Sequence, residues 1–192
     1  DALPILLEIN PKACFLPRLQ LNAPRWWEDA HQEELVQYGL PVNQKTHRMP
    51  EEFWEGGFNW RTNRDSYDPS LASQLWIADL THLLRAYLRH IENSPLRSRI
   101  MGYHVTSAQT AEWHYIGSEF LPDYSPAMQE KIGPIPPAED RLKKEFGLLR
   151  DPVKEKDVID FYRKFHENTA NTILHFRSEE HTSELQSLLI IS

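Results

Sequence analysis

Apolar and polar residues recur along the chain in two different periods. Residues 14–22 alternate, with Phe15, Leu19 and Leu21 on the apolar face, and this two-residue period predicts a β-strand whose other face turns polar toward its end. Residues 100–105 predict a second, shorter strand. Apolar positions three to four residues apart predict helices. The expected helical stretches are residues 3–9, 28–38, 70–93, 138–146 and 153–176.

The order of these elements predicts the class of fold. Strands that alternate with helices are typical of a parallel α/β sheet, in which a helix crosses over between neighbouring strands. A complete (β/α)8 barrel needs roughly 250 residues and eight strands. We therefore expect a piece of an α/β domain, about two βα units with elaborated loops. The longest of these loops, residues 41–69, is of a length that usually carries function or is an insertion.

Charge and hydropathy exclude two classes of partner. The chain has 192 residues, with 28 acidic against 21 basic side chains and a net charge of −7. No basic stripe is visible, so we expect no nucleic-acid partner. No apolar run approaches the roughly 18 residues of a membrane span, so we expect no membrane partner. The single cysteine, Cys14, lies in an apolar run and is predicted to be a buried, inert thiol.

Several kinds of chemistry lack their sequence motif. The chain contains no G-x-G-x-x-G, no P-loop and no G-x-S-x-G, which disfavours nucleotide binding and serine hydrolysis. His104 and His114 lack the spacing of a zinc-binding helix, and no third ligand is evident. We therefore expect no metal and no cofactor.

The C-terminal residues match the translation of a sequencing adapter. Residues 177–187 read, residue for residue, as an in-frame translation of a common short-read sequencing adapter, and residues 188–192 fit its continuation. We therefore predict that residues 1–176 are the native part, a fragment of a longer domain, and that residues 177–192 are a translated adapter. His181 and the glutamates near it are accordingly left out of every predicted site.

Glu112 is the main candidate for catalysis. It lies a few residues after the second predicted strand, and the carboxyl ends of parallel strands form the catalytic face of barrel enzymes. Trp113 and Tyr115 are its aromatic neighbours, and a carboxyl group in apolar surroundings becomes a usable general acid near neutral pH. The alternative, an ordinary exposed loop glutamate, stays open.

Polar and aromatic residues near the end of the first strand suit a sugar ligand. Arg18, Gln20 and Asn22 share the polar side of that strand and could hydrogen-bond sugar hydroxyls. Trp26 and Trp27 follow at once and could stack on a sugar face. The alternative is that these residues only pack against the sheet or plug its rim.

The chain also resembles a known family in several motifs. The motifs, in order, are N-P-K-A at 10–13, F-L-P-R-L at 15–19, A-P-x-W-W at 23–27, S-L-A-S-x-x-W at 70–76, I-M-G-Y-H at 100–104, T-A-E-W at 110–113 and D-F-Y-R-K-F at 160–165. Together they resemble the β-galactosidase-like glycoside hydrolases of clan A, near family 42, over most of residues 1–176.

The resemblance implies a fold and an activity. The fold would be a partial (β/α)8 TIM barrel, about strands three and four with their helices. The parent would be a retaining hydrolase of β-galactosides or related sugars, with Glu112 as the general acid/base. Its nucleophile, a second glutamate, would lie past Phe176, so the present chain is expected to be inactive. The residues expected to contact the carbohydrate are Arg18, Asn22, Trp26, Trp27, His104, Trp113 and Tyr115.

One position departs from the family pattern. Many members carry Asn before the acid/base, where it contacts the sugar 2-hydroxyl, and this chain carries Ala111. That departure favours an alternative, a non-catalytic carbohydrate-binding barrel. A second alternative is an α/β interaction domain with no sugar site.

Overall fold

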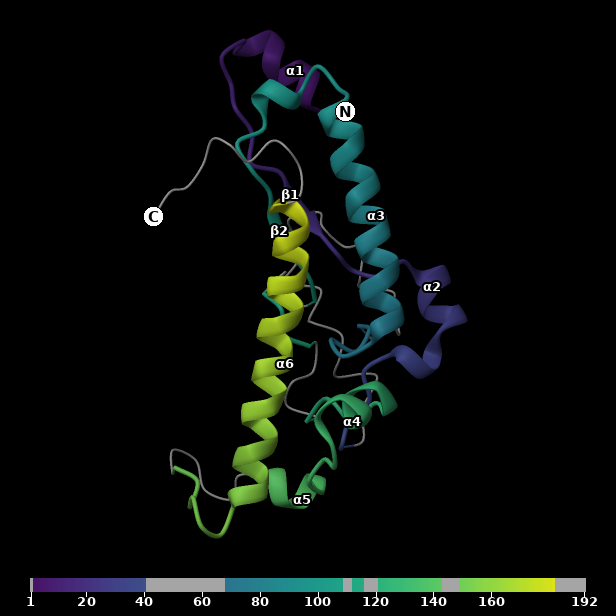
Figure 1. The fold of residues 1–192 in the computed structure, drawn as a ribbon, viewed down its shortest axis with the longest axis vertical. Helices are drawn as coiled ribbons and strands as arrows, with labels where there is room; N and C mark the ends of the chain where they lie inside the picture. The colour runs from purple at the N-terminus through teal and green to yellow at the C-terminus, as the bar shows by residue number, and fades with distance from the viewer. Residues whose placement is uncertain (1, 41–67, 109–111, 116–120, 143–148, 182–192) are drawn as a thin grey trace, which may run out of the picture.

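Two long helices run side by side along the molecule and cover one side of a short strand pair (Figure 1). The computed structural model describes residues 2–40, 68–108, 112–115, 121–142 and 149–181. The long helices are α3 (Gln74–Glu92) and α6 (Lys156–His181). Helix α1 (Ala2–Ile9) lies at one end of the molecule, and α4 (Pro126–Ile132) and α5 (Ala138–Arg141) lie at the other.

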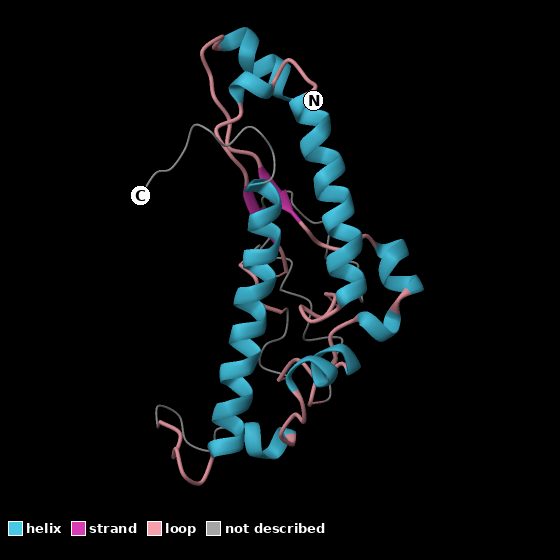
Figure 2. Cartoon of the chain, in the orientation of Figure 1, coloured by secondary structure: helices cyan, strands magenta, loops and turns pink. Residues whose placement is uncertain are grey.

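The strand pair is short and parallel. Strand β1 (Arg18–Gln20) pairs with β2 (His104–Thr106), the two magenta strands of Figure 2. An isolated bridge joins Phe15 to Ile100 upstream. Between the bridge and the strand pair, residues 101–103 lie opposite residues 16–17, so the segment before β2 carries one residue more. The N–H of Met101 donates to the carbonyl of Phe15, and the N–H of His104 donates to that of Pro17. In a parallel pair both carboxyl ends lie at the same edge, so the segments after the two strands begin side by side.

The connection from β1 to β2 is built around α3. It passes through α2 (Arg25–Ala30) and η1 (Gln32–Glu34), and it returns to β2 through η3 (Arg97–Arg99). Helix α3 begins where the Ser73 hydroxyl accepts a hydrogen bond from the backbone N–H of Trp76. Its buried residues recur at helical spacing and form one face. They are Trp76, Leu80, Thr81, Leu84, Leu88 and Ile91.

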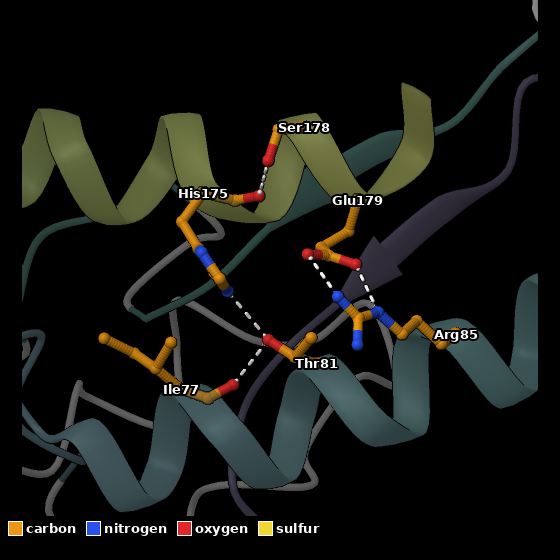
Figure 3. A network of polar contacts seen from close by, with 6 residues as sticks. All are labelled: Ile77, Thr81, Arg85, His175, Ser178 and Glu179. Atoms are coloured by element: carbon orange, nitrogen blue, oxygen red, sulfur yellow. Dashed lines mark hydrogen bonds and ion pairs between the residues drawn. The ribbon is translucent and has the colours of Figure 1, made fainter. Parts of the chain in front are cut away.

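Helices α3 and α6 run parallel and are joined by polar side chains (Figure 3). Thr81 Oγ1 donates its only proton to the carbonyl of Ile77 at 2.7 Å. In its contact of 2.8 Å with His175, Thr81 Oγ1 is therefore the acceptor and His175 Nε2 is the donor. One turn further on, Arg85 binds both carboxylate oxygens of Glu179, at 2.5 and 2.9 Å. The two contacts advance together along both helices, which fixes the parallel pairing.

A single hydrophobic cluster lies between the helices and the strand ends. It is centred on Trp76, whose ring meets the edge of the Phe176 ring at 5.5 Å between centroids. Leu19 and Val105 of the two strands pack against this cluster from the sheet side. The remaining buried members are Leu21, Ala23, Trp27, Leu35, Val36, Leu71, Leu80, Leu84, Leu88 and Tyr115.

The expected barrel segment is wrong. The described residues form a largely helical structure with one sheet of two three-residue strands, which is not the strand content of a TIM barrel. The alternation over 14–22 extends the chain without building a long strand, because Pro17 has no N–H to donate to a ladder. The parallel order of the two short strands, with helices after each, agrees with the predicted pattern.

Other elements differ from prediction in detail. The helix expected over 28–38 is the shorter pair α2 and η1, and α4 forms in a stretch where no helix was expected. Cys14 is exposed, not buried. Helix α6 continues past Phe176 to His181, but a helical conformation does not test the origin of residues 177–192, which stays a prediction.

None of the helices in the described part of the chain is both long and apolar enough to cross a membrane.

The Ser73 cap provides a test of the start of α3. Its side chain is fully buried, and the Ser73→Ala substitution removes the acceptor for the Trp76 N–H. We expect the free energy of unfolding to fall by about 1 kcal/mol, measured by urea denaturation. Ser98→Ala, at an exposed serine in η3, is the matched control and should change it by less than about 0.5 kcal/mol. Equal effects of the two substitutions would contradict the capping role.

Candidate functional site

The carboxyl ends of the two strands are tied together by side-chain bonds. Asn22 Oδ1 accepts from the backbone N–H of Ala108 at 3.1 Å, and Ser107 Oγ donates to the carbonyl of Leu21 at 3.3 Å. Asn22 Nδ2 is buried and has no acceptor among the described residues. A buried donor of this kind is normally satisfied by protein, water or a ligand, and the partner of Asn22 Nδ2 is not among the described residues.

Two described residues of the loop after β2 adopt the left-handed region. Ala108 has φ 60° and Trp113 has φ 61°. Non-glycine residues adopt this conformation at a cost of about 1–3 kcal/mol each, and they are retained mostly where a function or the surrounding packing demands them. The backbone N–H of Trp113 donates to the carbonyl of Ser107 at 3.0 Å, which closes the loop on its own start.

The turn at Trp113 sends neighbouring side chains in opposite directions. The Trp113 ring stacks on Phe176, with centroids 6.1 Å apart and planes at 27°. Glu112 and His114 lie on the other side, with side chains 68% and 46% exposed, and His114 Nδ1 is 3.9 Å from Glu112 Oε2. The loop therefore holds a carboxyl and an imidazole together in solvent above the strand ends, where they can donate or accept a proton.

The far end of the loop is anchored by a buried carboxyl group. Tyr115 OH donates to Asp123 Oδ2 at 2.9 Å and accepts from the N–H of Leu71 at 2.6 Å. Ser70 Oγ donates to the same carboxyl oxygen at 2.6 Å. Asp123 Oδ1 accepts from two backbone N–H groups, that of Ser125 at 2.8 Å and that of Gln37 at 3.3 Å. Four donors from four segments thus converge on one fully buried side chain.

The same polar cluster reaches α6. The carbonyl of Leu71 accepts from Thr172 Oγ1 at 2.8 Å and from Asn168 Nδ2 at 3.1 Å. The N–H of Leu71 meets Tyr115, so this one peptide segment links the loop to α6. We name Ser70, Leu71, Tyr115, Asp123 and Ser125 the Asp123 cluster. It holds the Glu112 loop in place from below.

The two predicted sugar-stacking tryptophans lie in different environments. Trp26 is 70% exposed, whereas Trp27 is 4% exposed and belongs to the core. The indole N–H of Trp27 donates to Asp79 of α3 at 2.8 Å, and its ring lies 4.7 Å from that of His31. Of the pair, Trp26 alone presents a ring to solvent.

The other predicted contacts are not gathered at one point. Arg18 and His104 are direct partners in the sheet register, and both are exposed at the amino ends of the strands. Asn22 lies at the carboxyl ends, beside the start of the Glu112 loop. Tyr115 is buried and its hydroxyl is occupied by the Asp123 cluster. Ala111, the departure from the family pattern, lies outside the described residues.

Sequence reasoning missed Asp123 and Ser70. Nothing in a pattern of polar positions shows that a loop aspartate is buried, because only the packing of distant segments buries it. The one local signal is the run Asp123, Ser125 and Pro126, which is typical of a helix start and also marks α4. Among the described residues, no group of three or more His, Cys, Asp or Glu could hold a metal ion.

The hydroxyl of Tyr115 allows a direct test of the cluster. Tyr115→Phe removes one atom and leaves two buried groups, the N–H of Leu71 and a carboxylate oxygen of Asp123, without that partner. We expect a loss of about 1–3 kcal/mol in the free energy of unfolding. Tyr162→Phe, whose hydroxyl makes no hydrogen bond to a described residue, serves as the control. If both variants unfold at the same urea concentration, the cluster does not support the fold.

Titration of Asp123 gives a second test. Burial raises its pKa above the ordinary 3.8, against the opposing effect of the hydrogen bonds from Ser70 and Ser125. The folded protein then keeps this proton to a higher pH than the unfolded chain does. The stability due to this group is complete below pH 3.8 and is lost as the pH rises through the folded-state pKa.

Asp123→Asn removes that pH dependence. We expect the free energy of unfolding of the wild type, relative to the variant, to decline as the pH rises above 3.8. Urea denaturation of both proteins over a pH series measures the difference. A difference that stays constant with pH would contradict the raised pKa of Asp123.

Comparisons of the chain with protein-family models, with curated proteins and with solved structures found no match.

Proposed function

We propose that this chain is part of a glycoside hydrolase in which Glu112 transfers the proton to and from the glycosidic oxygen. The observation that carries the proposal is the placement of Glu112. It lies on a closed loop at the carboxyl ends of two parallel strands, which is where open α/β sheets bind their ligands. Both ends of that loop are fixed, by Asn22 at the start and by the Asp123 cluster at the end.

Three features of the described residues suit a sugar. Asn22 Nδ2 is a buried donor that lacks a described acceptor, and a sugar hydroxyl supplies one. His114 lies close enough to Glu112 to influence its proton transfer. Trp26 exposes an indole ring, and flat apolar rings are what sugar faces stack on. The resemblance to β-galactosidase-like hydrolases supports a β-galactoside or a related sugar as the ligand.

The chemistry sets a requirement that Glu112 does not meet alone. A retaining hydrolase holds two carboxyl groups roughly 5–5.5 Å apart, one as nucleophile and one as acid and then base. The proposal assigns Glu112 the second role and places the nucleophile in a glutamate beyond Phe176. The chain as it stands is then expected to bind a sugar weakly and to hydrolyse none.

Binding can be tested by NMR on the whole chain. Methyl β-galactoside and lactose should shift the signals of the Asn22 side-chain amide and of the backbone N–H groups of Glu112 and His114, at millimolar sugar. Trp26→Ala should weaken the binding if its ring stacks on the sugar. Leu83→Ala, at an exposed apolar residue of α3, is the control and should leave the shifts unchanged. If none of the pyranosides tested shifts these NMR signals, the proposal is wrong.

Turnover separates an enzyme fragment from a binder. Aryl β-galactosides should be released no faster by the wild-type chain than by Glu112→Gln. A rate above that of Glu112→Gln would show that the second carboxyl group lies within this chain, contrary to its proposed place. Two results together would favour the non-catalytic binder that Ala111 suggests. One is sugar binding that is unchanged in Glu112→Gln, and the other is a lack of turnover in a longer protein that carries the same residues 1–176.

A further inference from the structure

Phe176 joins the two long helices to the loop that carries Glu112. Its side chain is fully buried, in the last two turns of α6. Its ring meets that of Trp76 of α3 edge-on, with centroids 5.5 Å apart and planes at 72°. The ring of Trp113 stacks on the same side chain, with centroids 6.1 Å apart and planes at 27°. One buried ring therefore contacts both the helix core and the loop.

The packing of α6 on α3 sets where the Phe176 ring lies. His175 donates to Thr81 Oγ1 at 2.8 Å, and one turn further on Arg85 binds both carboxylate oxygens of Glu179 (Figure 3). The two contacts advance by four residues on each helix, so a shift of α6 by one turn would break both. Because they lie immediately before and three residues after Phe176, they fix the rotation and the height of α6 at that residue.

Trp113 links the position of that ring to the position of its own neighbours. Its backbone lies in the left-handed region, at φ 61°, and its N–H donates to the carbonyl of Ser107 at 3.0 Å. A tryptophan keeps this strained conformation only where its surroundings demand it. In this turn the ring stacks on Phe176, while Glu112 and His114 lie in solvent with their polar atoms 3.9 Å apart. The stack is thus the contact that ties the turn to the core.

We infer that Phe176 is a positioning residue: through its stack on Trp113, the packing of α6 against α3 fixes where Glu112 and His114 lie. The inference deepens the proposed function, because its bearing on catalysis rests on Glu112 as the acid/base. The position of the loop is nevertheless a property of the folded chain, and it is measured without a sugar.

Hydrogen exchange of backbone amides, followed by NMR on the whole chain, tests the inference. The N–H of Trp113 is bonded to Ser107 and reports opening of the loop, whereas the N–H of Leu84, in the middle of α3, reports global unfolding. Phe176→Leu removes the flat partner of the stack. The Trp113 amide should then exchange about threefold faster or more, as expected for the loss of one aromatic pair. An unchanged rate at Trp113 would overturn the inference.

Phe161→Leu is the matched control. Phe161 also belongs to α6 and is 3% exposed, and its described ring contacts lie within α6 and with Arg141 of α5. The Leu84 amide should exchange faster in both variants, because each loses core packing. The Trp113 amide should change by less than about twofold in Phe161→Leu, as is usual for distant sites. Equal changes at Trp113 in the two variants would show a general loss of packing and would contradict the positioning role.

Two substitutions of Trp113 decide the question if Phe176→Leu does not fold. Trp113→Leu removes the ring from the loop side and leaves the core residue in place, so the amide of residue 113 should exchange about threefold faster or more. Trp113→Phe keeps a flat ring for the stack and should stay within about twofold of the wild type. If the leucine variant leaves the exchange unchanged, or if the phenylalanine variant opens the loop as much, the stack does not position the loop.

These exchange measurements and the sugar titration fail separately. A loop that loosens as expected, in a chain that binds no pyranoside, supports the positioning role and contradicts the proposed function. A chain that binds methyl β-galactoside, with the same affinity and the same loop exchange in the wild type and in Phe176→Leu, supports the proposed function and overturns the positioning role.

Discussion

The structure depends most on the burial of one carboxyl group, that of Asp123. Without a partner, a buried carboxylate costs far more than a folded domain can spare, because net stabilities are only about 5–15 kcal/mol. The chain offsets this cost with four hydrogen-bond donors to the carboxyl group, which come from Gln37, Ser70, Tyr115 and Ser125. Each donor fixes the segment that carries it, so satisfying one side chain arranges the strand ends, the start of α3 and the start of α4.

The position of Glu112 follows from this arrangement. Tyr115 cannot leave Asp123 without exposing two buried polar groups to an apolar interior, so the loop is held three residues after Glu112. Trp113 is held by its stack on Phe176. Trp113 itself lies in the left-handed region, and the turn leaves its two neighbours, Glu112 and His114, in solvent. Buried packing therefore selects which side chains of the loop remain available for chemistry.

The sequence predicts the elements that local patterns determine. Helices α3 and α6 follow from their apolar spacing, and the expected spans of 70–93 and 153–176 lie close to the observed ones. The predicted barrel segment is wrong, since Pro17 and the extra residue before His104 keep the strand pairing to three residues. The Asp123 cluster was missed because its members are distant along the chain, and no local pattern shows that they meet.

Aromatic residues show the same limit most plainly. Trp26 and Trp27 are neighbours with the same side chain, and the sequence offers no reason to separate them. The structure gives Trp27 a core position and an acceptor in Asp79, and it leaves Trp26 in solvent. An indole whose N–H is already satisfied in the core adds nothing to a ligand, whereas an exposed ring gains by covering a flat apolar face. Of the two rings, that of Trp26 is the one left open to a flat apolar partner, and Trp27 holds α2 against α3.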